Sequence, residues 1–224
     1  MPFCTKCGSE IPQEAFYCPV CGASVKGETS TLIPTQPKLA STSLFDRMIR
    51  AAKLDASLYE EVEADAFATT QAFIVVILSS ICSGIGTAIS QALTGKGPLG
   101  IGTGLIGGVF SAFIVWLAWS LITYYVGTSI FGGTASVGEL LRTLGFSNSP
   151  GVLLFFSFIP VLGGLVSFAV WVWGLIATVV AVRQALDFST GKAIFTCIIG
   201  WIVAIILLVI IGVVFAIPFF LLGL

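Results

Sequence analysis

The 224-residue chain contains no histidine and few charged residues. The lack of histidine excludes Ser–His and Cys–His catalytic pairs and every metal site that uses an imidazole ligand. Charged residues make up 9% of the chain, and ten Lys and Arg nearly balance eleven Asp and Glu. A net charge of −1 provides no basic surface for nucleic acid, so we expect no nucleic-acid partner.

Charge is scarcest after residue 68. Between residues 69 and 224, only six residues are charged: Lys96, Glu139, Arg142, Arg183, Asp187 and Lys192. A water-soluble domain would need a charged surface to cover so much apolar sequence, whereas a membrane-crossing helix needs about 20 mostly apolar residues. We therefore predict an all-α integral membrane protein whose membrane domain is residues 69–224.

Five hydrophobic segments within this domain predict a bundle of five transmembrane helices: residues 69–93, 99–126, 139–158, 165–186 and 193–220. Asn148-Ser149-Pro150 interrupts the third segment, which either crosses as a kinked helix or lies in the interface before a re-entrant dip. With five crossings and a cytoplasmic N-terminus, every Lys and Arg except Lys96 is cytoplasmic. Four crossings would move Arg183 and Lys192 outside, so the positive-inside bias favours five.

The first 22 residues contain two C-x-x-C-G motifs, Cys4-Thr5-Lys6-Cys7-Gly8 and Cys18-Pro19-Val20-Cys21-Gly22. Each motif can direct two thiolates at one ion, and the glycine that follows can adopt a positive φ. We predict that residues 1–24 form a zinc ribbon whose ligands to one structural Zn²⁺ are Cys4, Cys7, Cys18 and Cys21. An iron site and two disulfides are the alternatives.

The N-terminus has no apolar core like that of a signal peptide. We therefore expect the head to lie in the reducing cytoplasm, which disfavours disulfides. An odd number of crossings then places the C-terminus on the opposite side of the cell membrane.

Residues 25–42 are rich in Ser, Thr and Pro and predict a flexible linker. Residues 43–68 predict an amphipathic juxtamembrane helix that Ser43 caps and that Asp55 can restart. Its first half carries three basic residues opposite an apolar face: Arg47, Arg50 and Lys53. This pattern is typical of a helix lying on the membrane with basic side chains at the headgroups, and a soluble helix packed on the head is the alternative.

The second half of the juxtamembrane segment is acidic, with Glu60, Glu61, Glu63 and Asp65. Anionic lipid would repel these side chains. They therefore indicate a protein-contacting surface or a rigid lead into the first span.

The glycines of the second span match two patterns. Residues 102–107 read G-x-G-x-x-G, but neither a strand nor a βαβ unit accompanies them, so a dinucleotide site is rejected. Gly100, Gly104 and Gly108 repeat every four residues and predict a close helix–helix contact. Cys82 and Cys197 lie in apolar spans, where cysteine behaves as a small hydrophobic residue.

Three stretches carry a family resemblance: Leu54 to Asp65, Leu141 to Pro150 and Val182 to Ala193. Over about residues 50–220, the chain resembles the Yip family of membrane proteins, named for interacting with Ypt/Rab GTPases. The resemblance implies a five-span bundle with a cytoplasmic N-terminus, and a zinc-ribbon head is typical of bacterial or archaeal members. The D-L-Y-G-P-like motif of eukaryotic members reads Ser57-Leu58-Tyr59-Glu60-Glu61 here, without Gly-Pro, so a GTPase partner is not carried over.

No ionisable side chain lies deep in a predicted span, which argues against an ion-coupled transporter and against an enzyme. We expect a non-enzymatic scaffold or adaptor of the Yip type that acts in membrane organisation or trafficking. Its partners would be the bilayer, a protein at the head and juxtamembrane helix, and a second copy of the chain. The alternative is a passive transporter or channel for a small solute, which a cavity between the spans would favour.

Overall fold

The computed structural model describes residues 3, 6–10, 18–21, 43–93 and 99–221, and within the last range it describes side chains for 107–210. The chain divides into two compact units, Met1–Thr42 and Ser43–Leu224. The first holds the cysteine-rich head, and the predicted linker 25–42 lies outside the described residues. Every described helix belongs to the second unit.

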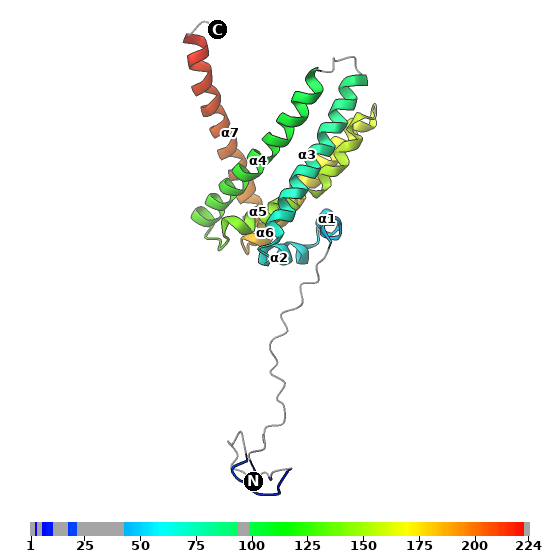
Figure 1. The fold of residues 1–224 in the computed structure, drawn as a ribbon. Coiled ribbons are helices and arrows are strands. Elements are labelled where there is room, and N and C mark those ends of the chain that lie inside the picture. Colours follow the sequence, from blue (N-terminus) through cyan, green and yellow to red (C-terminus); the bar gives the residue numbers. More distant parts are fainter. Residues whose placement is uncertain (1–2, 4–5, 11–17, 22–42, 94–98, 222–224) are drawn as a thin grey trace. The chain divides into compact units, whose positions relative to one another are not determined.

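Four long helices form most of the second unit (Figure 1): α3 (Ala68–Leu93), α4 (Leu99–Phe131), α6 (Leu162–Ala185) and α7 (Thr190–Leu221). Each contains a stretch long and apolar enough to cross a bilayer, so the described residues include four candidate spans. They coincide with four of the five predicted spans. Helix α4 extends to Phe131, beyond the predicted end of the second span at residue 126.

The third predicted segment consists of two short helices, α5 (Val137–Phe146) and the 3₁₀-helix η1 (Ser149–Phe158). Pro150 has no backbone N–H and cannot continue the α-helical hydrogen bonding. The side chains of Ser147 and Asn148 donate to the carbonyl oxygen of Leu144, at 2.8 Å each. These bonds satisfy the carbonyl oxygen of Leu144, which the break in the helix would otherwise leave without a hydrogen-bond partner in an apolar environment.

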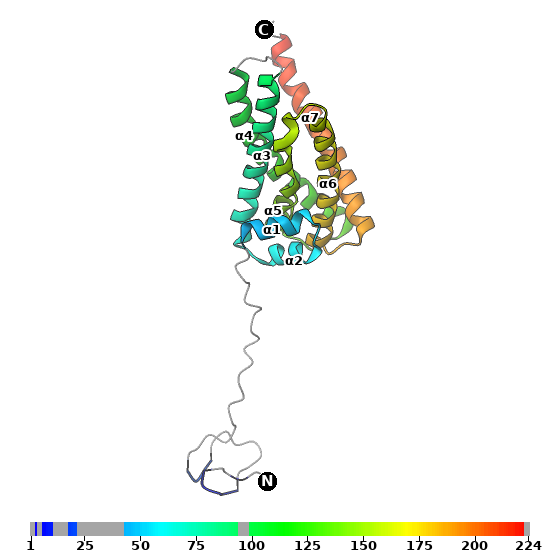
Figure 2. The same cartoon turned by 90° about the vertical axis from the view of Figure 1, so that its right-hand side faces the viewer.

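Helix α3 runs parallel to α5 and η1, as Figure 2 shows. Three pairs define this register, in which Ala72 lies against Gly145, Ser79 against Gly151, and Gly86 against Leu154. The residue numbers increase in both segments from one pair to the next, so the α5–η1 segment runs alongside α3, in the same direction, over most of its length.

The juxtamembrane segment is two helices, α1 (Leu44–Ala52) and α2 (Ala56–Ala64), rather than one. Ser43 accepts a hydrogen bond from the N–H of Asp46, and Asp55 accepts one from the N–H of Ser57. The predicted helix start and restart are therefore confirmed. Between them, Leu54 has φ 61°, and the chain turns there. Helices α1 and α2, here called the α1–α2 platform, lie where α3 and α5 begin and α6 ends (Figures 1 and 2).

Close helix contacts occur at glycines other than those expected. A Cβ added at Gly145 would lie 2.5 Å from the Cβ of Ala72, and one at Gly86 would overlap the carbonyl oxygen of Leu154. Gly108 faces open space, so the predicted contact is wrong at this position. Gly100 and Gly104 lie outside the residues whose side-chain surroundings are described. Sequence spacing identified a small-residue face, but small residues also border cavities.

Candidate functional site

Three of the four predicted metal ligands lie together in the head. The Sγ atoms of Cys7, Cys18 and Cys21 all lie within 4.8 Å of one another, and those of Cys7 and Cys18 are 3.5 Å apart. Thiolates bound tetrahedrally to one zinc ion at about 2.3 Å are about 3.8 Å apart, so this spacing fits a shared ion. Gly8 has φ 73°, which confirms the turn expected after the first motif. Cys4 lies outside the described residues.

Ser9 supports the thiolate form of these cysteines. Its Oγ lies 2.9 Å from the Sγ of Cys7 and 3.3 Å from that of Cys18. Hydrogen bonds from Ser9, and then from the backbone N–H groups of Cys21 and Val20, lower the pKa of Cys18 to about 6. Because the thiolate is the form that binds metal, the donor set fits a divalent cation. Ser9 was not among the predicted site residues, and its position directly after the first motif is the only signal for it in the sequence.

The three stretches that carry the family resemblance meet at the platform end of the membrane unit. Leu58 and Tyr59 are fully buried there. They share one core cluster with residues of α5 and α6: Leu140, Leu144, Phe146, Val182, Ala185 and Leu186. Leu58 and Tyr59 thus hold α2 against the bundle and offer no surface to a partner.

Arg142 joins α5 to the C-terminal end of α2. Its guanidinium donates to the carbonyl oxygen of Val62 at 2.8 Å and to that of Glu63. The last carbonyls of a helix lack hydrogen-bond partners within the helix and carry partial negative charge. A cationic donor there provides the missing hydrogen bonds and balances this charge. Glu139 forms a capping box with Ser136 at the start of α5. Both charges of this segment are therefore used in helix capping.

Arg47 faces protein, and the prediction that its side chain faces lipid headgroups is wrong. The Arg47 side chain is 3% exposed, and it contacts Glu61 and Asp65 at 2.9 Å each and Gln71 at 2.8 Å. Arg50 pairs with Asp55 at 2.9 Å and with Glu61 at 2.7 Å. These ion pairs neutralise much of the acidic half of the segment. The apolar side chains Phe45 and Ile49 are left exposed on α1.

Helix α6 fixes the platform from the other side. The indole N–H of Trp173 donates to the carbonyl oxygen of Ala52 at 2.7 Å, and Gln184 donates to Glu60 at 2.7 Å. Together with Arg142, these contacts make α1 and α2 a fixed part of the membrane unit.

Glu63 is the acid of the platform with a strongly raised pKa. Partial burial, and then the negative charges of Glu139 and Asp187, raise the pKa to about 7 from its usual value near 4.5. Glu60 adds to this effect, and Arg142 opposes it. The folded protein therefore holds the Glu63 proton more tightly than the unfolded chain does, and ionisation of Glu63 destabilises the fold.

Replacing Glu63 with glutamine is expected to stabilise the protein above pH 7 and to change little below pH 4.5. The protonated carboxyl contributes its full stabilisation below the pKa that Glu63 has in the unfolded chain, near 4.5. This contribution is lost as the pH rises through about 7, the pKa of Glu63 in the folded protein. Water screens this half-exposed group, so we expect a gain of about 1 kcal/mol at pH 8. Thermal unfolding in detergent at pH 5 and pH 8 measures it, and an equal shift at both values would contradict the assignment.

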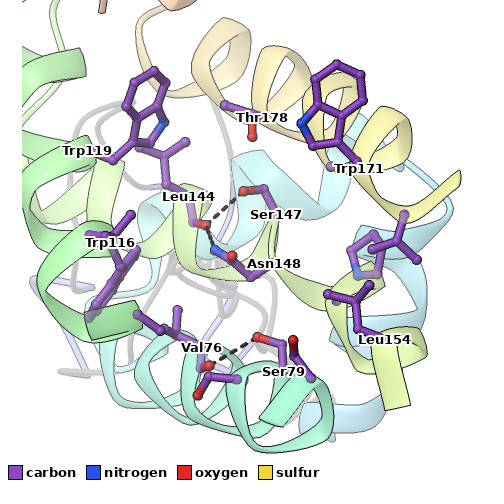
Figure 3. A pocket seen from close by; sticks show the side chains of 18 of the residues that line it. Val76, Ser79, Trp116, Trp119, Leu144, Ser147, Asn148, Leu154, Trp171 and Thr178 are labelled. Atoms are coloured by element: carbon purple, nitrogen blue, oxygen red, sulfur yellow. Dashed lines mark hydrogen bonds between the residues drawn. The ribbon is translucent and has the colours of Figure 1, made fainter. Parts of the chain in front are cut away.

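A cavity of about 760 Å³ lies between the helices of the membrane unit (Figure 3). Its lining comes from α3, α4, α5, η1, α6 and α7 and includes four tryptophans: Trp116, Trp119, Trp171 and Trp201. Ser79, Ser147 and Asn148 place polar atoms on its wall. None of the described residues that line it is charged. The cavity was not predicted from the sequence. The signal that could have located part of its wall is Asn148-Ser149-Pro150, which interrupts the third segment.

The chain matches two family models. The Yip1 domain model covers residues 59–211, and a zinc-ribbon domain model covers residues 3–25. Searches of curated proteins and of solved structures each find no match. The chain therefore belongs to the Yip1 family, whose members are generally non-enzymatic membrane proteins. It is a multi-pass membrane protein with an N-terminal zinc ribbon.

Proposed function

We propose that this protein is a non-enzymatic membrane adaptor that presents its zinc ribbon and its α1–α2 platform to a protein partner in the cytoplasm. The observation that carries the proposal is the segregation of charge. Every described charged residue after position 42 lies within 46–65, 139–142 or 183–192, at the platform end. The rest of the described spans offers no Asp, Glu, Lys or Arg for catalysis or ion coupling.

Five crossings fit this arrangement. The ten residues of α5 rise about 15 Å at 1.5 Å each, and the ten of η1 rise about 20 Å at 2.0 Å each. Their sum of about 35 Å exceeds the 30 Å hydrocarbon core. With α5–η1 as a crossing, Arg142, Arg183 and Lys192 share the side of the platform, as the positive-inside bias favours.

Cysteine labelling at the two ends of α6 tests this topology. In a background with Cys82 and Cys197 replaced by alanine, Val161→Cys is expected to react with a membrane-impermeant thiol reagent on intact cells, and Ser189→Cys is not. Both positions are exposed in the structure. Four crossings would reverse the result, because α5–η1 would then return to the side on which it began.

We propose that Cys4, Cys7, Cys18 and Cys21 together bind one zinc ion, supported by the three clustered sulfurs and by the zinc-ribbon match. Replacing Cys18 or Cys4 with serine should lower the zinc content of the purified full-length protein from about one ion to well below half an ion per chain. Mass spectrometry of metals measures it, with Cys82→Ser as the control. Retention of zinc by Cys4→Ser would exclude Cys4 from the ligand set.

Site-specific photocrosslinking in living cells tests the adaptor role. A photoreactive amino acid at Val20 in the head, or at Lys53 on the platform, is expected to capture the same partner protein. Both side chains are exposed. At Leu165, which is exposed on α6, it should not capture that protein. Cys18→Ser should abolish capture from position 20. Identical products from all three positions would argue against a dedicated partner.

Passage of a small uncharged solute is a second candidate function, favoured by the cavity. If the protein passes such a solute, glycerol should enter proteoliposomes faster than it enters protein-free vesicles. Light scattering measures the rate of entry. Gly174→Leu should stop such entry, since Gly174 lines the cavity and no atom lies within 4 Å of its added Cβ.

A further inference from the structure

The lining of the cavity is mostly apolar and carries a few polar side chains. At the rim lie exposed apolar side chains, among them Val115, Trp171 and Leu208. On a membrane-crossing bundle, such side chains face lipid tails. The buried part of the lining, here called the floor, is mostly apolar, but it includes the hydroxyls of Ser79 and Ser147, and the exposed Asn148 lies next to Ser147 (Figure 3). A molecule that fits this lining is mostly apolar and has a small polar end.

We propose that the cavity binds a neutral lipid with a hydroxyl headgroup, its hydroxyl on the floor beside Asn148 and its chain leaving past the rim toward the bilayer. No described residue of the head or of the platform lines this cavity, so the proposal holds whether or not the adaptor role does. A volume of about 760 Å³ suits a headgroup and part of a chain.

The floor selects a hydrogen-bond donor. The hydroxyls of Ser79 and Ser147 donate to the carbonyl oxygens of Val76 and Leu144, at 3.0 and 2.8 Å. Their oxygens keep lone pairs that accept hydrogen bonds. Asn148 donates to Leu144, which leaves its amide oxygen as a further acceptor. A lipid hydroxyl can donate to this group of acceptors and accept from the second amide hydrogen of Asn148.

Charge on the ligand is disfavoured. The described lining has no Lys, Arg, Asp or Glu to balance a phosphate or an ammonium group. Moving an unpaired charge to this depth costs several kcal/mol. A phospholipid headgroup is therefore excluded from the floor, whereas a glycerolipid with a free hydroxyl is not.

The broken third segment provides the polar wall. Asn148, Gly151 and Leu154 all line the cavity at intervals of three residues, the repeat of a 3₁₀-helix. Irregular backbone within a membrane domain is tolerated where it lines a cavity. An unbroken α-helix would carry these three positions around its axis, whereas η1 keeps Gly151 and Leu154 on one face.

Photolabelling with two matched lipids tests the proposal. Purified full-length protein in phosphatidylcholine vesicles is irradiated with a diacylglycerol or a phosphatidylcholine that carries the same diazirine acyl chain. Diacylglycerol is expected to label peptides of the wall around Val76–Ser83 and Trp171–Thr178 at least about fivefold more than phosphatidylcholine, the equivalent of one hydrogen bond.

Variants of α6 and of Asn148 complete the experiment. Gly174→Leu fills the cavity and should reduce diacylglycerol labelling about fivefold, whereas Gly164→Leu, equally open but outside the lining, should leave it unchanged. Asn148→Leu keeps the branched shape of the side chain but removes its amide, and it should reduce diacylglycerol labelling to the level of phosphatidylcholine. Equal labelling by both lipids in the wild-type protein, or no effect of Gly174→Leu, would overturn the proposal. Glycerol entry that Gly174→Leu blocks, without preferential lipid labelling, would also overturn it.

Discussion

Replacing Gly145 with leucine is expected to prevent the membrane unit from folding stably. An added Cβ would lie 2.5 Å from the Cβ and 3.1 Å from the Cα of Ala72, so α3 and α5 would have to separate. Overpacking a close contact costs about 1–3 kcal/mol for one or two methylenes, and leucine adds more. Fluorescence-detected size-exclusion chromatography after heating should show an early loss of the monodisperse peak, with Gly174→Leu as a tolerated control.

A compensating change distinguishes the Ala72 contact from a general intolerance of α5. Gly145→Ala alone should lower stability by about 1–2 kcal/mol, and Ala72→Gly alone by about 1 kcal/mol through helix propensity. Because Ala72→Gly removes the nearest atom, the double variant should be more stable than the sum of the two effects implies. Simple additivity would mean that the two residues do not touch.

Arg47→Met is expected to have the second large effect, a loss of about 3–5 kcal/mol. The Arg47 side chain is 3% exposed, and its removal takes from Asp65 the cation that it contacts at 2.9 Å and leaves Glu61 with its ion pair to Arg50. An uncompensated charge in this environment costs more than the intact ion pair gains. The thermal midpoint in detergent should fall by about 6–20 °C.

Removing the acids together with the arginine should recover most of this loss. The triple variant Arg47→Met, Glu61→Gln, Asp65→Asn carries no unpaired charge at this position, although Arg50 loses one partner. Lys53→Met changes an exposed side chain of the same segment and should have little effect. If Arg47→Met proved as mild as Lys53→Met, Arg47 would face solvent or headgroups after all.

The sequence was informative where structure depends on local spacing. The C-x-x-C-G motifs predicted that Cys7, Cys18 and Cys21 lie together, because two cysteines in C-x-x-C spacing can direct their thiolates at one ion. Run length located four spans, and Ser43 and Asp55 cap the helices that they were expected to start. These features require no knowledge of distant neighbours.

The sequence was less informative where structure depends on what covers a face. The helical pattern put Arg47 and Arg50 on the face opposite the apolar side chains, but it could not reveal that Glu61 and Asp65 lie against them. The cavity was invisible for the same reason, since its walls come from every long helix of the membrane unit. Gly108 borders this open space, although its spacing indicated a tight contact.

If α5–η1 crosses the bilayer as proposed, the winding of η1 couples the length of this segment to membrane thickness. Ten residues at the 3₁₀ rise reach about 20 Å, whereas the same ten residues wound as an α-helix reach about 15 Å. Rewinding would therefore draw Phe158 about 5 Å back toward Asn148 and pull the beginning of α6 with it. A thin bilayer favours the shorter form and a thick one the longer. Because Gly151 and Leu154 would rotate in the process, bilayer thickness would also reshape the cavity wall.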